Sequence, residues 1–446
     1  MGYLTKKWAG KVLSLMCNRL IVQKTISLNV RESSAFLFLS SVMTFPRSYL
    51  ILKVIMFAIF LIINAATLIK EKTILIHVRI IVFYYLIAGI GLIWAIVGYV
   101  NGGAFVGIVD NLRLYVLWSV VLCIVFNLLL QGNAFLVFHK SIVTAGILIS
   151  SMNYFALYNH VGQLGYIPDA VLRELHMYIG IHEGYIQIIS HNIGALFFIT
   201  AYLITIQFRK DMSSLNGIIV KLSLLMCLAL VVLSGRRALW IAISMAPFLI
   251  VLLTAITDSF NQLRGRKWLL LIVFAGFIPV IIVLDFALSG EFANNSSLSH
   301  LQAAFSSSDE RTLQKDYLID GFKNYPVFGS GFGVNADYLR NEERPWLYEL
   351  TYHQMLFNFG VVGISLFFTL IATYVYYAVA FISQRNQDSG YAFSMLVAIM
   401  VFSIGAYSNP YFGSFDFLLL LGVLPLITAS FYVDKYRNNI TSLGGS

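Results

Sequence analysis

Long apolar runs follow one another along most of the chain. Most are close to the length of about 20 residues that a helix needs to cross the hydrocarbon core of a bilayer. Transmembrane strands would alternate apolar and polar residues over segments of about ten. These runs are continuous, so we expect helices. The sequence predicts about twelve spans, at 34–45, 48–69, 74–100, 112–130, 134–157, 184–207, 216–233, 238–257, 268–288, 348–382, 391–409 and 414–433.

Two polar stretches separate these runs. The longer one, 290–347, contains a predicted helix over 309–323 that Ser308 or Asp309 would cap. The shorter one, 158–183, is rich in His and Tyr. We therefore expect an all-α polytopic membrane protein with one large loop. Its segments would be a basic lead or interfacial helix at 1–33, nine spans within 34–289, the loop at 290–347, three spans within 348–433 and a tail at 434–446.

Composition agrees with this pattern. Hydrophobic residues make up 59% of the chain and charged residues only 11%, with a mean hydropathy of +0.80, whereas a soluble domain carries about 25% charged residues. This excludes a water-soluble domain and a nucleic-acid-binding module, in spite of the formal net charge of +9. The three cysteines have no metal-ligand spacing and suggest no disulfide framework. We expect no metal site and no cofactor.

The positions of the basic residues predict the orientation of the spans. With the N-terminus in the cytoplasm, most Lys and Arg fall on the cytoplasmic side, including those within 1–33, 70–72, 209–210, 264–267 and 435–437. The short loops on the other side contain only Arg47, Arg113, Arg173, Arg236 and Arg237. The positive-inside rule therefore places both termini in the cytoplasm and the loop at 290–347 outside.

Arg236 and Arg237 stand at the predicted outer end of the span 216–233, in the sequence LSGRRALW. A guanidinium in this place can anchor the helix by reaching to lipid headgroups. It can also clamp a phosphate through two parallel hydrogen bonds, which arginine does better than lysine. These residues alone leave both interpretations open.

Arg311 lies on the helix predicted over 309–323. It is either part of an ordinary surface helix, paired with Asp316 or another neighbour, or a ligand-binding arginine. The loop that follows reads PVFGSGFG from Pro326 to Gly333. Because no strand precedes these glycines, we interpret them as tight turns and not as a nucleotide-binding loop.

Glu349 and His353 stand where the loop enters the span 348–382. They are four residues apart, so on a helix they would share one face. Either side chain could take the proton of a hydroxyl nucleophile, which contributes about 10²–10⁴-fold in rate. The alternative is that Glu349 only complements the dipole at the start of the helix.

Together these elements resemble the O-antigen polymerase and ligase superfamily. The resemblance rests on an S-x-[SR]-R element at Ser234–Arg237, on Arg311 with P-x-x-G-x-G-x-G at Pro326–Gly333, and on Glu349 eleven positions before the G-x-x-G at Gly360. It implies a metal-independent glycosyltransferase of the GT-C type in the bacterial inner membrane. Such enzymes take a sugar chain from undecaprenyl diphosphate on the periplasmic face.

The residue at the Glu349 position distinguishes the branches of this superfamily. Its ligases carry a His followed by Asn, Ser or Gln there, whereas this chain has Glu349 followed by Leu350, with His353 and Gln354 four residues late. We therefore favour an O-antigen polymerase, which joins undecaprenyl-diphosphate-linked oligosaccharide repeats. The alternatives are an O-antigen ligase that uses lipid A-core as acceptor and a lipid-linked sugar transporter. A transporter would place ionisable residues near mid-membrane.

The resemblance also implies roles for individual residues. Arg237 and Arg311, with Arg236, would hold the diphosphate, because electrostatic stabilisation is usually the largest catalytic contribution. Glu349 would deprotonate the acceptor hydroxyl, with His353 as helper or alternate base, and the anomeric centre would invert. Aromatic residues near the outer face would stack on sugars or belong to the interfacial belt; they are Trp240, Trp346, Tyr348 and Tyr352. The expected partners are the lipid bilayer, the undecaprenyl-diphosphate-linked oligosaccharide and, as a candidate, a chain-length regulator.

Overall fold

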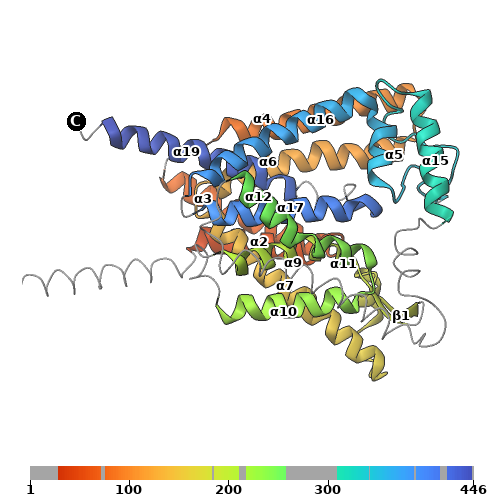
Figure 1. Ribbon diagram of the computed structural model, residues 1–446, viewed down its shortest axis with the longest axis horizontal. Helices are drawn as coiled ribbons and strands as arrows, with labels where there is room; N and C mark the ends of the chain where they lie inside the picture. The colour runs from red at the N-terminus through yellow and green to blue at the C-terminus, as the bar shows by residue number, and fades with distance from the viewer. Residues whose placement is uncertain are drawn as a thin grey trace, which may run out of the picture.

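The computed structural model describes residues 29–71, 76–182, 185–209, 217–257, 309–340, 342–385, 388–411 and 419–443. This part of the chain is almost entirely helical (Figure 1). The helices are α2 (Val30–Thr44), α3 (Leu50–Glu71), α4 (Val78–Val100), α5 (Phe105–Leu112), the π-helix η1 (Arg113–Leu117), α6 (Trp118–Leu129), α7 (Ala134–Val161), α8 (Asp169–Glu174), the 3₁₀ helix η2 (Ile193–Ala195), α9 (Leu196–Phe208), α10 (Ile218–Leu233), α11 (Arg237–Ser244), α12 (Ala246–Ile256), α15 (Asp309–Asn324), α16 (Thr351–Ser383), α17 (Ser389–Gly405), the 3₁₀ helix η5 (Ala406–Ser408) and α19 (Val423–Leu443).

The helices coincide with the apolar runs. Within the described residues, 6 helices are long and apolar enough to cross a membrane, and shorter apolar helices occupy Ile193–Phe208, Ile218–Leu233, Ser389–Gly405 and Leu419–Val433. With α2 they account for every predicted span except 268–288, which lies outside the described residues. The structure thus confirms an all-α polytopic membrane protein.

Three predicted boundaries were wrong. The first span begins at Val30, because Asn29 and Glu32 form a capping box there. The span predicted at 112–130 begins at Phe105, since the π-helical turn η1 keeps α5 and α6 continuous. The span predicted at 184–207 starts with a strand, and its apolar helix begins only at Ile193, after the polar sequence Ser-His-Asn.

That strand belongs to a short hairpin. β1 (Tyr178–His182) pairs antiparallel with β2 (Tyr185–Ile189), with Ile179 opposite Ile188. The hairpin and the short helix α8 fill the polar segment that follows α7. They lie at the same end of the bundle as α15, opposite the C-terminal end of α19 (Figure 1). We call this the α15 end. It carries the loops that the sequence places outside.

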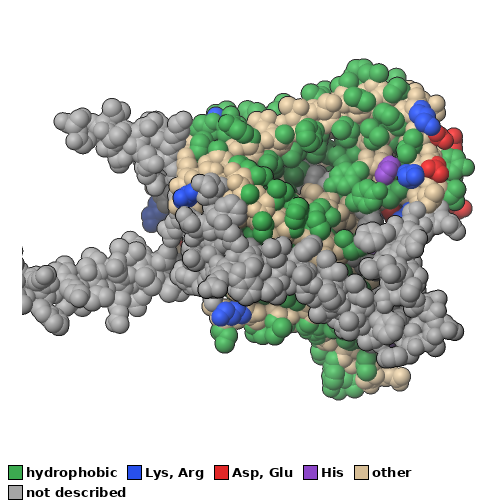
Figure 2. All heavy atoms as spheres, viewed as in Figure 1, with side chains coloured by type: hydrophobic (Ala, Val, Ile, Leu, Met, Phe, Trp, Pro, Cys, Tyr) green, Lys and Arg blue, Asp and Glu red, His purple; other side chains and the backbone are tan. Residues whose placement is uncertain are grey.

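The surface has an apolar part along the bundle and a charged part that includes the α15 end. Hydrophobic side chains cover much of the face of the bundle that is coloured in this view, while the acidic side chains in view lie at the α15 end; basic side chains lie both there and toward the opposite end (Figure 2). On α3 the residues Ile51, Val54, Ile55 and Ile62 are exposed, as suits a helix that faces lipid. In contrast, α17 is packed on nearly all sides, with Ala392, Phe393 and Met395 among its buried residues.

The predicted glycine turns connect the outer loop to the bundle. The loop after α15 lies between α4 and α16: Phe332 N donates to Trp94 O at 3.1 Å, and Gly331 N donates to Asn358 O at 3.0 Å. Gly329, Gly331 and Gly333 all have positive φ, as tight turns require. A Cβ on Gly331 would overlap the backbone of Gly98. This close backbone contact is what the P-x-x-G-x-G-x-G motif makes possible.

The second glycine motif serves the same contact. Gly360 has φ +58° inside α16, where it breaks the helical geometry. The loop after α15 forms hydrogen bonds with the backbone next to this kink. Val361 N donates to Pro326 O and Val362 N donates to Val327 O, both at 3.0 Å. The two motifs therefore act as one structural unit that fixes the loop, and with it α15, against α16.

Candidate functional site

α15 lies across the outer end of α16. The described helix covers Asp309–Asn324, in agreement with the helix predicted over 309–323, and its Gln314 and Leu318 are fully buried. Gly321 faces the ring of Phe357 on α16 so closely that a Cβ there would press on the ring. Because Arg311 precedes Gln314 and Leu318 by three and seven positions, it shares their helix face and points toward the start of α16.

Arg311 meets Glu349 there. Arg311 Nε donates to Glu349 Oε2 at 3.0 Å, and Arg340 Nη2 donates to the other carboxylate oxygen, Oε1. Gln314 Oε1 accepts the backbone N–H of Glu349 at 3.0 Å. We call Arg311, Gln314, Arg340 and Glu349 the Glu349 group. Two guanidiniums thus converge on one carboxylate at the α15 end of the bundle.

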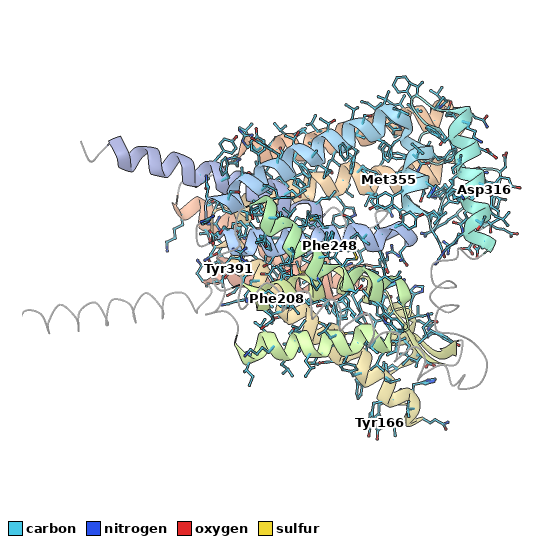
Figure 3. The ribbon with its side chains drawn as sticks, in the orientation of Figure 1. Tyr166, Phe208, Phe248, Asp316, Met355 and Tyr391 are labelled. Carbon is cyan, nitrogen blue, oxygen red and sulfur yellow. The ribbon has the colours of Figure 1, made fainter. Side chains whose placement is uncertain are left out.

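The structure shows which neighbour Arg311 pairs with, namely Glu349 and not Asp316. Asp316, the expected partner on a plain surface helix, pairs with Lys315 at 3.8 Å instead. The side chain of Glu349 is 24% exposed and that of Arg311 is 40% exposed, so the group can be reached from outside. Asp316 on α15 and Met355 on α16 mark this end of the molecule in Figure 3.

Arg340 was missed in the sequence because it belongs to no motif. The loop between α15 and α16 folds back on itself, and Ala336 N donates to Tyr348 Oη at 2.8 Å. Burial raises the pKa of Tyr348 to about 12, so this phenol stays neutral and serves as a fixed point of the loop. The fold of the loop brings Arg340 to Glu349, nine residues further along the chain.

Arg236 lies in a turn that the S-x-[SR]-R element builds. Ser234 ends α10, and its Oγ accepts the N–H of Arg236 at 3.3 Å. Gly235 has φ +62°, and Arg236 is the N-cap of α11. Arg237 is the first residue of α11, and its side chain lies outside the described part of the structure. The glycine turn thus sets both arginines at the α15 end.

Arg236 belongs to a second cluster of basic and imidazole side chains. Its Nη1 donates to Tyr411 Oη at 3.1 Å, while Arg47 Nη2 donates to Pro410 O at 3.0 Å. Near them the rings of His176 and His191 stack with centroids 4.1 Å apart. We call Arg47, His176, His191 and Arg236 the Arg236 group.

His191 in this group is uncharged near neutral pH. Burial lowers its pKa to about 4, with further lowering by His176, Arg47 and Arg236 and an opposing effect of Glu174. Its Nδ1 lies 3.3 Å from Ser48 Oγ. His191 therefore adds no positive charge to the Arg236 group near neutral pH.

One hydrogen bond joins the segment that carries Glu349 to the segment that contacts Arg47 and Arg236. Thr351 Oγ1, at the start of α16, donates to Asn409 O at 2.7 Å. Thr351 follows Glu349 by two residues, and Asn409 directly precedes the partners of Arg47 and Arg236, which are Pro410 and Tyr411. Both groups thus adjoin the start of α16 and the segment that follows α17, which this hydrogen bond joins.

His353 is not placed relative to Glu349 as the spacing predicted. α16 begins at Thr351 with Leu350 as N-cap, so Glu349 precedes the helix and the shared helix face does not apply. His353 Nδ1 is buried and has no hydrogen-bond partner among the described residues. Its ring lies 6.3 Å from that of Tyr407, centroid to centroid.

The aromatic residues divide into one accessible ring and three buried ones. Tyr352 is 38% exposed, and its Oη donates to Ser403 O at 2.6 Å. Trp240 is only 4% exposed, and its Nε1 donates to Val231 O at 2.7 Å, which leaves almost no ring surface for a sugar. Trp346 and Tyr348 are also buried. We therefore assign Trp240 a packing role, and of the four only Tyr352 stays a candidate for stacking.

The fold is that of a multi-pass membrane protein, and arginine and carboxylate side chains meet at its α15 end. Residues 222–368, roughly a third of the chain, match the family model described as O-Antigen ligase. The matched segment contains Arg236, Arg311, Arg340 and Glu349 and ends within α16. A comparison with curated proteins gives no match. The family match confirms the resemblance to the O-antigen polymerase and ligase superfamily and supports a glycosyltransferase-like enzyme of glycan assembly.

Proposed function

We propose that the protein is an O-antigen polymerase of the bacterial inner membrane. It joins undecaprenyl-diphosphate-linked oligosaccharide repeats into a polysaccharide on the periplasmic face, with both termini in the cytoplasm. The observation that carries the proposal is the Glu349 group, in which two arginines and one carboxylate meet at the membrane surface inside the segment that matches the family.

The reaction needs only a few groups because the diphosphate is already a good leaving group. The acceptor hydroxyl gives its proton to the Glu349 carboxylate, and its oxygen attacks the anomeric carbon of the donor sugar. The bond from that carbon to the phosphate oxygen breaks, and the diphosphate leaves with the electron pair. Arginines neutralise the charge that develops on it. Attack from the opposite face inverts the anomeric centre.

The predicted catalytic residues, together with Arg236 and Tyr352, have places in this proposal, whereas Trp240 has none. Arg311 and Arg237 hold the diphosphate, and Arg236 contacts the substrate beside them from the Arg236 group. His353 assists as helper or alternate base, because its buried Nδ1 has hydrogen-bonding capacity that the described residues do not use. Tyr352 stacks on a sugar ring of the bound chain.

The residues around Glu349 favour a polymerase over a ligase. Gln354, which follows His353 as the ligase pattern requires, donates from Nε2 to Trp346 O at 2.8 Å. It thus holds the loop in place. Glu349 in turn occupies the family's base position and is directly engaged by Arg311. A transporter is less well supported, since the groups discussed above lie at one membrane face and not at mid-membrane.

An acceptor comparison tests the proposal. Purified protein is incubated with undecaprenyl-diphosphate oligosaccharide alone and together with lipid A-core, and the products are separated on a gel. A ladder from the lone donor is the expected result. Products that form only with lipid A-core would make the protein a ligase. If the lipid binds but nothing is transferred under either condition, the enzyme proposal fails and transport becomes the better explanation.

A further inference from the structure

Glu349 offers its two carboxylate oxygens to two different arginines. One arginine comes from α15 and the other from the loop after it, so the sequence does not place them side by side. Each guanidinium is a planar fork of hydrogen-bond donors that suits a phosphate as well as a carboxylate. The pair therefore forms a ready two-pronged site for a small anion, and Glu349 occupies it.

We propose that Arg340 and Arg311 together bind the diphosphate of the donor lipid, and that Glu349 competes with the diphosphate for both arginines. The inference rests on the proposed function and adds Arg340 to it as a binding residue. When phosphate oxygens take the two guanidiniums, the oxygens of Glu349 lose those partners. The carboxylate can then accept the proton of the acceptor hydroxyl. Binding of the donor diphosphate would therefore also release Glu349 to act as the base.

The exposure of the three side chains allows the diphosphate to replace Glu349 as the partner of Arg311 and Arg340. The side chains of Arg311, Arg340 and Glu349 are 40%, 31% and 24% exposed, and ion pairs so near water cost little to separate. A diphosphate brings more negative charge and more acceptor oxygens than one carboxylate, so it is the stronger partner for two guanidiniums.

Glu349 keeps its place when the arginines change partner. Its backbone N–H donates to Gln314 Oε1 at 3.0 Å, and Gln314 is fully buried. Arg340 also has a second carboxylate nearby, since its Nε lies 3.7 Å from Glu310 Oε1. The backbone of Glu349 is thus held by Gln314, while the hydrogen bonds of its side chain to described residues go to Arg311 and Arg340, the two groups that the diphosphate would take.

Binding of undecaprenyl diphosphate, without a sugar, tests the competition. The dissociation constant is measured for purified wild type, Glu349→Gln, Arg340→Ala and Arg340→Lys. Removal of the competing charge should make Glu349→Gln bind about tenfold more tightly, although it transfers sugar about 10²–10⁴-fold more slowly. Arg340→Ala should bind about tenfold more weakly, and Arg340→Lys should recover part of that loss. A general effect of one less negative charge is checked with Asp320→Asn, whose exposed pair with Lys323 lies on the same helix; its affinity should equal that of wild type.

The outcomes separate this inference from the proposed function. If wild type makes a ladder but Glu349→Gln binds the lipid no more tightly than wild type, the competition is refuted and the polymerase stands. If Arg340→Ala and wild type bind undecaprenyl diphosphate with equal affinity, Arg340 is not a diphosphate-binding residue. If wild type neither binds undecaprenyl diphosphate nor makes a ladder, the proposed function itself fails. Thermal unfolding of each variant identifies loss of affinity through misfolding.

Discussion

The Glu349 group and the Arg236 group both contain two arginines, but the arginines have different kinds of partner. In the Glu349 group the guanidiniums of Arg311 and Arg340 meet a carboxylate. In the Arg236 group the arginines donate to neutral oxygens, the carbonyl of Pro410 and the phenol of Tyr411. In the first arrangement the guanidiniums already have an anionic partner, which an incoming anion would have to displace. The second fixes the arginines in place and leaves their charge available. We therefore assign the chemistry to the Glu349 group and a supporting role to the Arg236 group.

The largest effect should come from the proposed base. Glu349→Gln should lower the rate of transfer by about 10²–10⁴-fold, the usual contribution of a general base, when elongation is measured by gel. His353→Gln should retain activity within about tenfold, because His353 only assists in the proposal. If His353→Gln loses the larger factor in rate and Glu349→Gln stays within about tenfold of wild type, the base is His353 and the ligase interpretation is better supported.

Loss of an arginine should cost less, and differently in the two groups. Arg311→Ala removes a charged hydrogen bond worth about 1.5–3 kcal/mol, so kcat/KM should fall by roughly 10–150-fold. Arg236→Ala should raise KM by less than about tenfold with little change in kcat, as expected for a contact made equally in the ground and transition states. A larger loss in Arg236→Ala than in Arg311→Ala would reverse the assignment of the two groups.

The glycine contact that sets α15 against α16 predicts a smaller effect, and on stability. Gly331 has φ +80°, and a Cβ there would overlap the backbone of Gly98. Gly331→Ala should therefore lower the free energy of unfolding by roughly 1–3 kcal/mol through backbone strain. Gly89→Ala is the matched control, because nothing lies within 4 Å of a Cβ at that position. Unchanged stability of Gly331→Ala would show that the loop does not rest on this contact.

The smallest effect should come from Trp240. Trp240→Phe removes the hydrogen bond to Val231 O and should cost about 1 kcal/mol of stability. The KM for the lipid-linked donor should stay the same, because the ring is buried. An increase in KM without loss of stability would return Trp240 to the substrate site.

The sequence predicts those features that depend on local pattern. The apolar runs locate the spans, the polar start at Ser308 or Asp309 predicts the helix that the structure describes as α15, and the glycines after Pro326 locate the turns. In each case the deciding residues are neighbours in the chain, so hydropathy and backbone preference are sufficient. Arg311 was a candidate for the same reason, since it stands on a recognisable helix before a recognisable motif.

Features that depend on tertiary packing could not be predicted in this way. Arg340 reaches Glu349 only because the loop between α15 and α16 folds back, which no periodicity encodes. The spacing of Glu349 and His353 misled because α16 starts two residues after Glu349. The burial of Trp240 depends on how α10 and α11 pack, and an aromatic residue at a span end looks the same in the sequence whether buried or exposed.

A structure of the protein with undecaprenyl diphosphate bound would test the central claim most directly. We predict that the phosphates lie within hydrogen-bonding distance of Arg311 and Arg340, and that neither arginine still contacts the Glu349 carboxylate. Phosphates bound at Arg47 and Arg236 instead, with the pair of Arg311 and Glu349 intact, would contradict the account and move the donor site to the Arg236 group.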